Sequence, residues 1–376
     1  CWREVPGAEL VAVASATTER ASSFAKRFGV AAVHDDAESL IASRELDAVD
    51  LCVPNALHRP LAVEAAMAGK HVICTKPLTA YVGQDLPANA TDADVSARDR
   101  GRMAAVAEAD GLAMLAAADQ SGVVLCYGEN WLYAPAFLRA ESLLIQAGGP
   151  LLEMRGWEAH SGSHSPYAKA WRHTGGGALL RLGAHPIGAM LHLKRVEGMR
   201  RLGRPIRVAE VSAETADLTR TEGFDPSSSP LASGWQDVEN WGCVVLRFED
   251  GSRGVAYGSD NQLGGMQSRL ELSAARCRVE CNLSPNDQLR AYSPDGDVLG
   301  DAYLIEKQST TAGWSTPMVG EDWSSGQLAM CRAFAEAIQS GVAPAADGWL
   351  GLEVVRVLYA AYCAAAEGRR VPLELG

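Results

Sequence analysis

The pattern of hydrophobic positions changes in character about a third of the way along the chain. Short, nearly continuous apolar runs at 8–15, 47–54, 70–76 and 122–128 alternate with stretches of helical spacing. This alternation predicts βαβ units, and strands that are apolar on both faces predict a parallel sheet covered by helices on both sides. We therefore expect residues 1–133 to form a doubly wound α/β domain of the Rossmann type, which binds dinucleotides.

A polar, Gly- and Pro-containing stretch at 81–101 interrupts this rhythm. It is longer than most connections in a compact domain. A surface loop is the expectation, with a lid or an oligomer arm as alternatives.

The pattern after residue 134 predicts a second, α+β domain over 134–376. A strand at 151–160 is followed by a glycine-rich loop that runs into a helix. Further strands then follow one another without intervening helices at 207–218, 241–260, 267–275, 276–282 and 288–296. Successive strands predict a mostly antiparallel sheet, which can leave one face free to pair with another subunit. Two late helices, at 325–341 and 350–367, are expected to pack back towards the first domain.

Composition narrows the class of protein. Hydrophobic residues make up 47% of the 376 residues, and the net charge is -12. This hydrophobic content is sufficient for a packed core. The negative net charge disfavours binding to nucleic acid or to anionic membranes. No apolar run approaches the roughly 18 residues of a membrane-spanning helix. The nine cysteines are scattered without metal-ligand spacing, so we expect no metal site and a reducing, cytoplasmic environment.

The beginning of the chain lacks an expected motif. A Rossmann domain places G-x-G-x-x-G after its first strand, with an acidic residue about 20 positions further on. No such glycine motif occurs in the 376 residues, which begin at Cys1. If 8–15 is the second strand, the spacing places the glycine loop before Cys1, and we expect the chain to be truncated there.

Three segments carry a family resemblance. VPNALHRPLAVEAAMAGKHVICTKPLT, GENWLYAPAF and GGGALLRLGAHPIG, together with the late antiparallel sheet, resemble the glucose-fructose oxidoreductase and inositol dehydrogenase (Gfo/Idh/MocA) family. The resemblance covers nearly the whole chain from Val5 onward. It implies an NAD(P)-dependent oxidoreductase acting on sugars, cyclitols or related polyols, and a homo-dimer or homo-tetramer associated through the sheet domain.

The resemblance also implies site residues. Pro54, Asn55 and His58 fall in the loop that lines the nicotinamide. Lys76 and Pro77 match the family's E-K-P motif, with Thr75 in place of the acidic residue. Lys76 is then the catalytic lysine, which binds the reacting hydroxyl and relays its proton. Its alternative is an ordinary surface lysine at a strand end.

The family's D-x-x-x-H pair is altered. His185 is present, but Arg181 occupies the aspartate position. Arg181 cannot act as a base, and a guanidinium near Lys76 and His185 is expected to lower the pKa of both and to bind an anionic substrate. His185 or Lys76 is then the proton acceptor in hydride transfer. Alternatively, Pro186 disturbs the helix, and Arg181 and His185 are purely structural.

Two further groups complete the candidate site. The loop EAHSGSHSPYAKAWRH offers Tyr167, Trp171, Arg172 and His173 to a sugar, although a plain solvent loop fits the same residues. Ser15, Thr17 and Arg20 follow the first predicted strand, where the absence of an acidic residue removes repulsion against a 2'-phosphate. The cofactor is therefore NAD or NADP, with a lean towards NADP.

Two alternative functions stay open from the residues alone. One is a glycosidase-type or lyase reaction in which the bound nucleotide is recycled. The other is a non-catalytic descendant of the family, for which the altered D-x-x-x-H pair and the absent glycine loop are the arguments.

Overall fold

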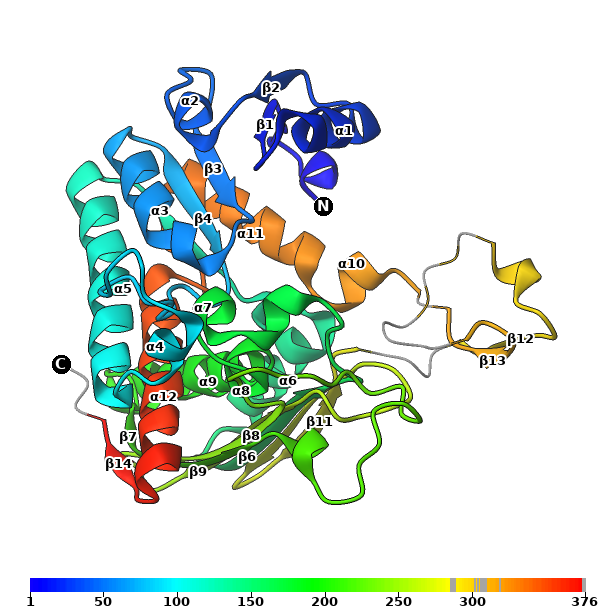
Figure 1. The fold of residues 1–376 in the computed structure, drawn as a ribbon. Coiled ribbons are helices and arrows are strands. Elements are labelled where there is room, and N and C mark those ends of the chain that lie inside the picture. Colours follow the sequence, from blue (N-terminus) through cyan, green and yellow to red (C-terminus); the bar gives the residue numbers. More distant parts are fainter. Residues whose placement is uncertain (285–288, 301, 303, 305–309, 318, 374–376) are drawn as a thin grey trace.

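The computed structural model describes residues 1–284, 289–300, 302, 304, 310–317 and 319–373. Figure 1 shows an α/β part at the N-terminal end and, beneath it, a broad sheet with the long helices between the two. This arrangement confirms the expected fold class, a Rossmann-type part followed by a mostly antiparallel sheet. The expected strand at 288–296 begins at residue 288, which lies outside the described residues.

The α/β part contains parallel strands whose connections include helices. Its elements are β1 (Ala12–Ala14), α1 (Thr18–Phe28), β2 (Ala32–His34), α2 (Ala37–Ile41), β3 (Ala48–Leu51), α3 (His58–Met67), β4 (His71–Thr75), α4 (Asp92–Ser96), α5 (Arg100–Ser121) and β5 (Leu125–Gly128). Local signals set their ends: the Thr17 side chain caps α1, and Gly29 ends it in a left-handed conformation.

The parallel strands form two separate sheets. β1 pairs with β2, while β3, β4 and β5 form a sheet in that order. The doubly wound order has one more strand position between β1 and β3. Within the described residues, the N-terminal turn η1 (Trp2–Glu4) lies beside β3, and the Trp2 indole donates a hydrogen bond of 2.7 Å to Asp50.

The rest of the chain builds the large sheet and the helices that cover it. Its elements are η3 (Asn130–Tyr133), α6 (Pro135–Ala147), β6 (Leu151–Ala159), α7 (Trp171–Thr174), α8 (Ala178–Arg181), α9 (Ala184–Leu202), β7 (Val208–Ala216), β8 (Trp241–Phe248), β9 (Arg253–Ser259), β10 (Gln267–Ala274), β11 (Arg278–Asn282), β12 (Ala291–Ser293), β13 (Gly313–Ser315), α10 (Glu321–Ser324), α11 (Gln327–Ser340), α12 (Gly348–Glu367) and β14 (Val371–Pro372).

The large sheet has the order β11-β10-β6-β9-β8-β7-β14. All its pairs are antiparallel except β6 with β9. Helix α9 packs so closely on β6 that a Cβ at Gly156 would lie 2.7 Å from Pro186. The long helices cover this side of the sheet and leave the other side open (Figure 1).

Helix α12 is a core helix. It contacts α5, α9, β5 and β7. By length and hydropathy it is the one helix among the described residues that could span a membrane, which the sequence analysis did not expect. However, 72% of its apolar window is buried by the rest of the chain, as in the core of a globular protein.

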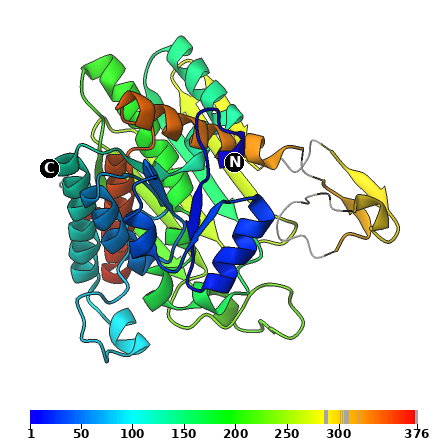
Figure 2. The ribbon, with the colours of Figure 1, turned by 90° about the horizontal axis from the view of Figure 1, so that it is seen from above.

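The segment 81–101 is more than a surface loop. Tyr81 and Val95 are completely buried, and α4 within the segment contacts α7. By contrast, the β12–β13 hairpin projects away from the body in two perpendicular views (Figures 1 and 2).

Candidate active site

The carboxyl ends of β3, β4 and β5 bring chemistry-bearing residues to one edge. Pro54 and Asn55 follow β3, Lys76 follows β4, and Glu129 follows β5. Ligands bind at this edge of open parallel sheets. Lys76 therefore lies where the sequence analysis places it.

Lys76 has a desolvated ammonium group. Its Nζ donates a hydrogen bond to the backbone oxygen of Arg181. Burial lowers the pKa of Lys76; the carboxylates of Glu158, Glu129 and Asp260 oppose this shift, and the Arg181 guanidinium adds to it. The neutral amine that can accept a proton is thus more populated than for a lysine in water. The expected effect of Arg181 on Lys76 is present, but desolvation is the larger cause.

His185 forms a buried pair with Glu129. The imidazole Nδ1 lies 2.8 Å from Glu129 Oε1, and both side chains are almost fully buried. The Trp131 ring stacks on the imidazole, with 5.6 Å between ring centroids. Because a carboxylate only accepts hydrogen bonds, we assign the proton to Nδ1, which leaves the Nε2 lone pair available. Glu129 thus holds His185 in the tautomer whose Nε2 can accept a hydrogen bond.

A second carboxylate approaches the other ring nitrogen. Glu158 Oε1 lies 3.9 Å from His185 Nε2, and Glu158 Oε2 accepts a 3.1 Å hydrogen bond from the Ser268 hydroxyl. Glu158 is on β6 and is 5% exposed. His185 therefore lies between two buried carboxylates from different parts of the chain.

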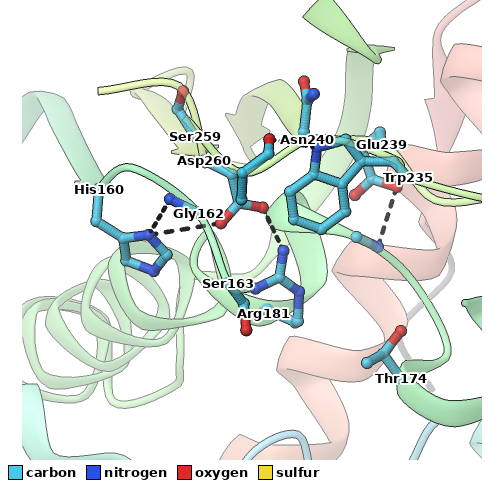
Figure 3. A network of polar contacts seen from close by, with 12 residues as sticks. His160, Gly162, Ser163, Thr174, Arg181, Trp235, Glu239, Asn240, Ser259 and Asp260 are labelled. Atoms are coloured by element: carbon cyan, nitrogen blue, oxygen red, sulfur yellow. Dashed lines mark hydrogen bonds and ion pairs between the residues drawn. The ribbon is translucent and has the colours of Figure 1, made fainter. Parts of the chain in front are cut away.

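Arg181 is already paired. Its guanidinium binds the buried carboxylate of Asp260 and lies over the Trp235 ring at 5.5 Å from its centroid (Figure 3). His160 Nδ1 lies 3.6 Å from the other oxygen of Asp260. This corrects the expectation that the Arg181 charge is free for an anionic substrate, because Asp260 neutralises it. Arg181 and His185 also lie on different helices, α8 and α9, rather than on one helix face.

The glycine-rich segment is held by Glu239. Its carboxylate accepts hydrogen bonds of 3.0 Å from the backbone N–H groups of Gly177 and Leu179, and one of 2.9 Å from the Tyr362 hydroxyl. Figure 3 shows Glu239 beside this segment. A Cβ at Gly177 would lie 1.9 Å from the Glu239 backbone oxygen, so only glycine fits. Glu239 therefore anchors the start of α8, which leads to Arg181 and His185.

The expected nicotinamide-side residues divide into two kinds. The Asn55 amide donates a 2.7 Å hydrogen bond to the Thr174 backbone oxygen, which joins this loop to α7. His58, in contrast, is fully buried and bonds to the backbone oxygens of Val53, Pro77 and Leu78. His58 and the buried Pro77 thus shape the turn that carries Lys76, which corrects their assignment as cofactor contacts.

The candidate substrate residues of the loop EAHSGSHSPYAKAWRH also fall into two groups. Tyr167 is 40% exposed, stacks on His173 and donates a 2.9 Å hydrogen bond to the His173 backbone oxygen. Trp171 is 2% exposed and donates to the Tyr81 backbone oxygen, while Arg172 pairs with Asp92 in the 81–101 segment. Trp171 and Arg172 therefore hold the fold together, and their expected substrate-facing role is corrected.

The expected ribose-side residues lie beyond β1. Ser15 follows the strand, and Thr17 caps α1 by accepting a hydrogen bond from the Arg20 backbone N–H. The Arg20 side chain is exposed. Thr18 Oγ1 lies 3.4 Å from Asp35 Oδ1, so an acidic side chain lies close to this end of β1 after all.

Three carboxylates escaped the sequence analysis. Glu129 stands within GENWLYAPAF at the end of a parallel strand, a position that could have identified it. Glu158 shares strand parity with Met154 and Gly156, both buried, and this signal predicts an inward carboxylate. Asp260 follows β9, and no local signal connects it to Arg181, 79 residues earlier.

Comparison with known proteins gives consistent matches in both parts of the chain. Residues 1–108 match the GFO_IDH_MocA oxidoreductase family with an NAD-binding Rossmann fold, and residues 146–280 match the GFO/IDH/MocA C-terminal domain. Levoglucosan dehydrogenase of Pseudarthrobacter phenanthrenivorans is 25% identical over 356 residues, 90% of this chain and 83% of that protein.

Two other similarities differ in extent. D-apiose dehydrogenase of Paraburkholderia graminis is 32% identical over 135 residues, which cover 36% of this chain and 29% of that protein. The crystal structure of GenD2 from gentamicin A biosynthesis, in complex with NAD, superposes with a TM-score of 0.76 at 25% identity, covering 98% of this chain and 89% of that one.

Proposed function

We propose that this chain, which belongs to the GFO/IDH/MocA family of NAD(P)-dependent oxidoreductases, transfers a hydride between nicotinamide and a secondary alcohol carbon of a sugar or cyclitol. The observation that carries the proposal is the desolvated Lys76 amine beside the buried His185–Glu129 pair, at the carboxyl edge of a parallel sheet. The names of the sugar dehydrogenases among its relatives support the substrate class.

The chain's own residues fit the two ends of a nicotinamide dinucleotide. Ser15, Thr17 and Arg20 would hold the adenosine ribose end, and Pro54, Asn55 and Lys76 the nicotinamide end. When bound, the nicotinamide ring supplies the hydride acceptor or donor. Buried Glu129 Oε2, which has no hydrogen-bond partner among the described residues, leaves an unused acceptor in the same centre.

The protein's part in the chemistry is to move a proton. In the oxidation direction, the C–H bond breaks with its electron pair leaving as hydride, the O–H proton passes to His185 Nε2 or to the Lys76 amine, and a C=O bond forms. The imidazolium would be stabilised by Glu129 at 2.8 Å. Arg181, neutralised by Asp260, favours an uncharged substrate over a sugar acid.

The cofactor is NAD or NADP. Ser15, Thr17 and the exposed Arg20 support the lean towards NADP, because a guanidinium can bind a 2'-phosphate. The Asp35 carboxylate near Thr18 opposes it. The ratio of kcat/KM for the two cofactors decides between them.

The direct test of the proposed function is accumulation of reduced nicotinamide. The chain is mixed with NAD or NADP and with neutral polyols, including levoglucosan, D-xylose and myo-inositol, and absorbance of the reduced ring is followed. Stoichiometric accumulation is expected with at least one polyol, and Lys76→Ala should lower turnover by about 10²- to 10⁴-fold. Product formation without accumulation would instead indicate a recycled nucleotide, and unchanged turnover in Lys76→Ala would reject the role of Lys76.

The open side of the large sheet supports assembly into a homo-dimer or homo-tetramer. Trp157 and Tyr257 stack there with 5.6 Å between ring centroids, next to the 38%-exposed Val245. Charged pairs such as Arg247–Glu210 lie further out on the same sheet. An apolar centre with a polar rim is typical of protein interfaces. The nine free cysteines support a cytoplasmic location.

A further inference from the structure

His185 and Glu158 bring two hydrogen-bond acceptors close together. With its Nδ1 proton donated to Glu129, His185 offers the Nε2 lone pair, and Glu158 Oε1 lies 3.9 Å away. This separation is too long for a hydrogen bond between the two atoms. No proton is shared between them directly.

One hydroxyl cannot satisfy both acceptors, because a hydroxyl carries one proton. Two hydroxyls can, one for each acceptor. Hydroxyls on adjacent carbons are close enough together for each to reach its own acceptor, at an oxygen–acceptor distance of about 2.8 Å, when the two acceptors are separated by this distance. The geometry therefore matches a vicinal diol better than an isolated alcohol.

Glu158 is built to keep its position. Its second oxygen accepts the Ser268 hydroxyl at 3.1 Å, and Glu158 and Ser268 are paired residues of the antiparallel strands β6 and β10. Both side chains are buried. A carboxylate fixed in this way loses a charge-assisted hydrogen bond whenever the bound ligand fails to donate one.

We propose that Glu158 is a specificity-determining residue that binds the hydroxyl on the carbon next to the one being oxidised, while His185 Nε2 takes the reacting hydroxyl. This inference rests on the proposed function. It restricts the substrate class to polyols with a free hydroxyl beside the reacting carbon. The carboxylate that binds substrate then comes from Glu158 on strand β6, and not from the position of Arg181, where the family has an aspartate.

The test compares a polyol with its monodeoxy analogues. The probe is the polyol of the panel that reduces the cofactor fastest, together with analogues that lack one neighbouring hydroxyl. The wild-type protein should prefer the parent polyol by about 10²-fold or more in kcat/KM, because a site built for a hydroxyl rejects the analogue without it. Glu158→Met, which keeps the volume but has only a weakly accepting thioether sulfur, should reduce this preference to within about threefold, and Glu158→Gln should give an intermediate value.

Glu153→Gln is the matched control, since Glu153 lies on the same strand with an exposed side chain that pairs with Arg155. Its preference should equal that of the wild type. A preference unchanged in Glu158→Met, in a variant with a wild-type melting temperature, would overturn the proposal. If Glu158→Met does not fold, Glu158→Gln with an unchanged preference serves the same purpose.

A binding measurement separates this inference from the proposed function. Calorimetric titration of the wild type and Glu158→Met with every polyol of the panel and with its monodeoxy analogues requires no turnover. A wild-type affinity difference that disappears in the variant supports Glu158 even if no nicotinamide is reduced, which would reject the proposed function alone. Turnover with equal affinity for parent and analogue rejects the inference alone, and absence of both turnover and binding rejects both.

Discussion

At the scale of single residues, the site is defined by where protons can reside. Lys76 has a lowered pKa because its ammonium group is desolvated. His185 has its Nδ1 hydrogen-bonded to Glu129 and its Nε2 3.9 Å from Glu158 Oε1. Desolvation of Lys76 favours its neutral, proton-accepting form.

The lowered pKa of Lys76 has a consequence for stability. In the unfolded chain the group titrates near 10.5, and in the folded protein at a lower pH. Between these two values the unfolded state binds more protons, so the free energy of unfolding rises with pH through this window and the charged lysine destabilises the fold below it. Lys76→Met should therefore stabilise the protein at pH 7 by on the order of 1 kcal/mol while lowering turnover by about 10²- to 10⁴-fold.

Urea unfolding at pH 7 and pH 10 measures this effect. Lys70→Met is the matched control, since Lys70 precedes the same strand and its amine also donates to a backbone oxygen, that of Leu46 at 2.7 Å. Lys70→Met should lose roughly 0.5–1.5 kcal/mol with the hydrogen bond. A Lys76→Met variant less stable than the wild type at pH 7 would contradict the account.

At the scale of elements, the positions of the strands along the chain were more predictable than the contacts between distant residues. The expected strands at 47–54, 70–76 and 122–128 contain β3, β4 and β5, because parallel strands are nearly continuous apolar runs. Lys76 and His185 could be proposed from the sequence because each lies in a recognisable motif. Glu129, Glu158 and Asp260 were missed because their roles depend on contacts across the fold, and Trp171 was misassigned because its burial is created by the distant residues Tyr81 and Tyr362.

The glycine-rich segment before α8 offers a test at this scale. Gly177 has no room for a Cβ, because the Glu239 backbone oxygen would lie 1.9 Å from it. Gly177→Ala should displace the start of α8, destabilise the protein by about 1–3 kcal/mol and lower kcat. Thermal unfolding and steady-state kinetics measure both effects.

Gly101→Ala is the comparison variant, since its Cβ would meet only Asp99 Oδ1, at 3.2 Å. Gly101 lies in the first turn of α5, where alanine is a better helix former. Equal stability and activity of the two alanine variants would show that the segment tolerates displacement, against the role given to Glu239.

At the scale of the whole molecule, the two sides of the large sheet have different roles. The covered side carries Glu158 and packs on the helix of His185, while the open side presents Trp157, Tyr257 and Val245. The sequence predicts that this sheet is mostly antiparallel, but it predicts neither the strand order nor which face is covered. Alternation shows that a strand has two faces, but not which neighbour covers each face.

Assembly through the open side is expected in solution. Light scattering should give a mass of at least twice the 39.9 kDa of one chain, and Val245→Arg should lower that mass by placing a charge in the apolar centre. Leu138 lies on α6 and is 48% exposed, and Leu138→Arg should leave the mass unchanged. A monomeric wild type would contradict this part of the account.

Hydride passes directly from the polyol carbon to the nicotinamide in the proposed reaction, and isotope tracing follows that atom. The chain is incubated with oxidised NAD or NADP and with the active polyol carrying deuterium on its carbinol carbons, and the reduced cofactor is analysed by mass spectrometry and NMR. The account predicts one deuterium at C4 of the nicotinamide in the wild type, with greatly reduced transfer in Lys76→Ala. A reduced cofactor that carries no deuterium, or a polyol that is consumed while the nicotinamide stays oxidised, would contradict it.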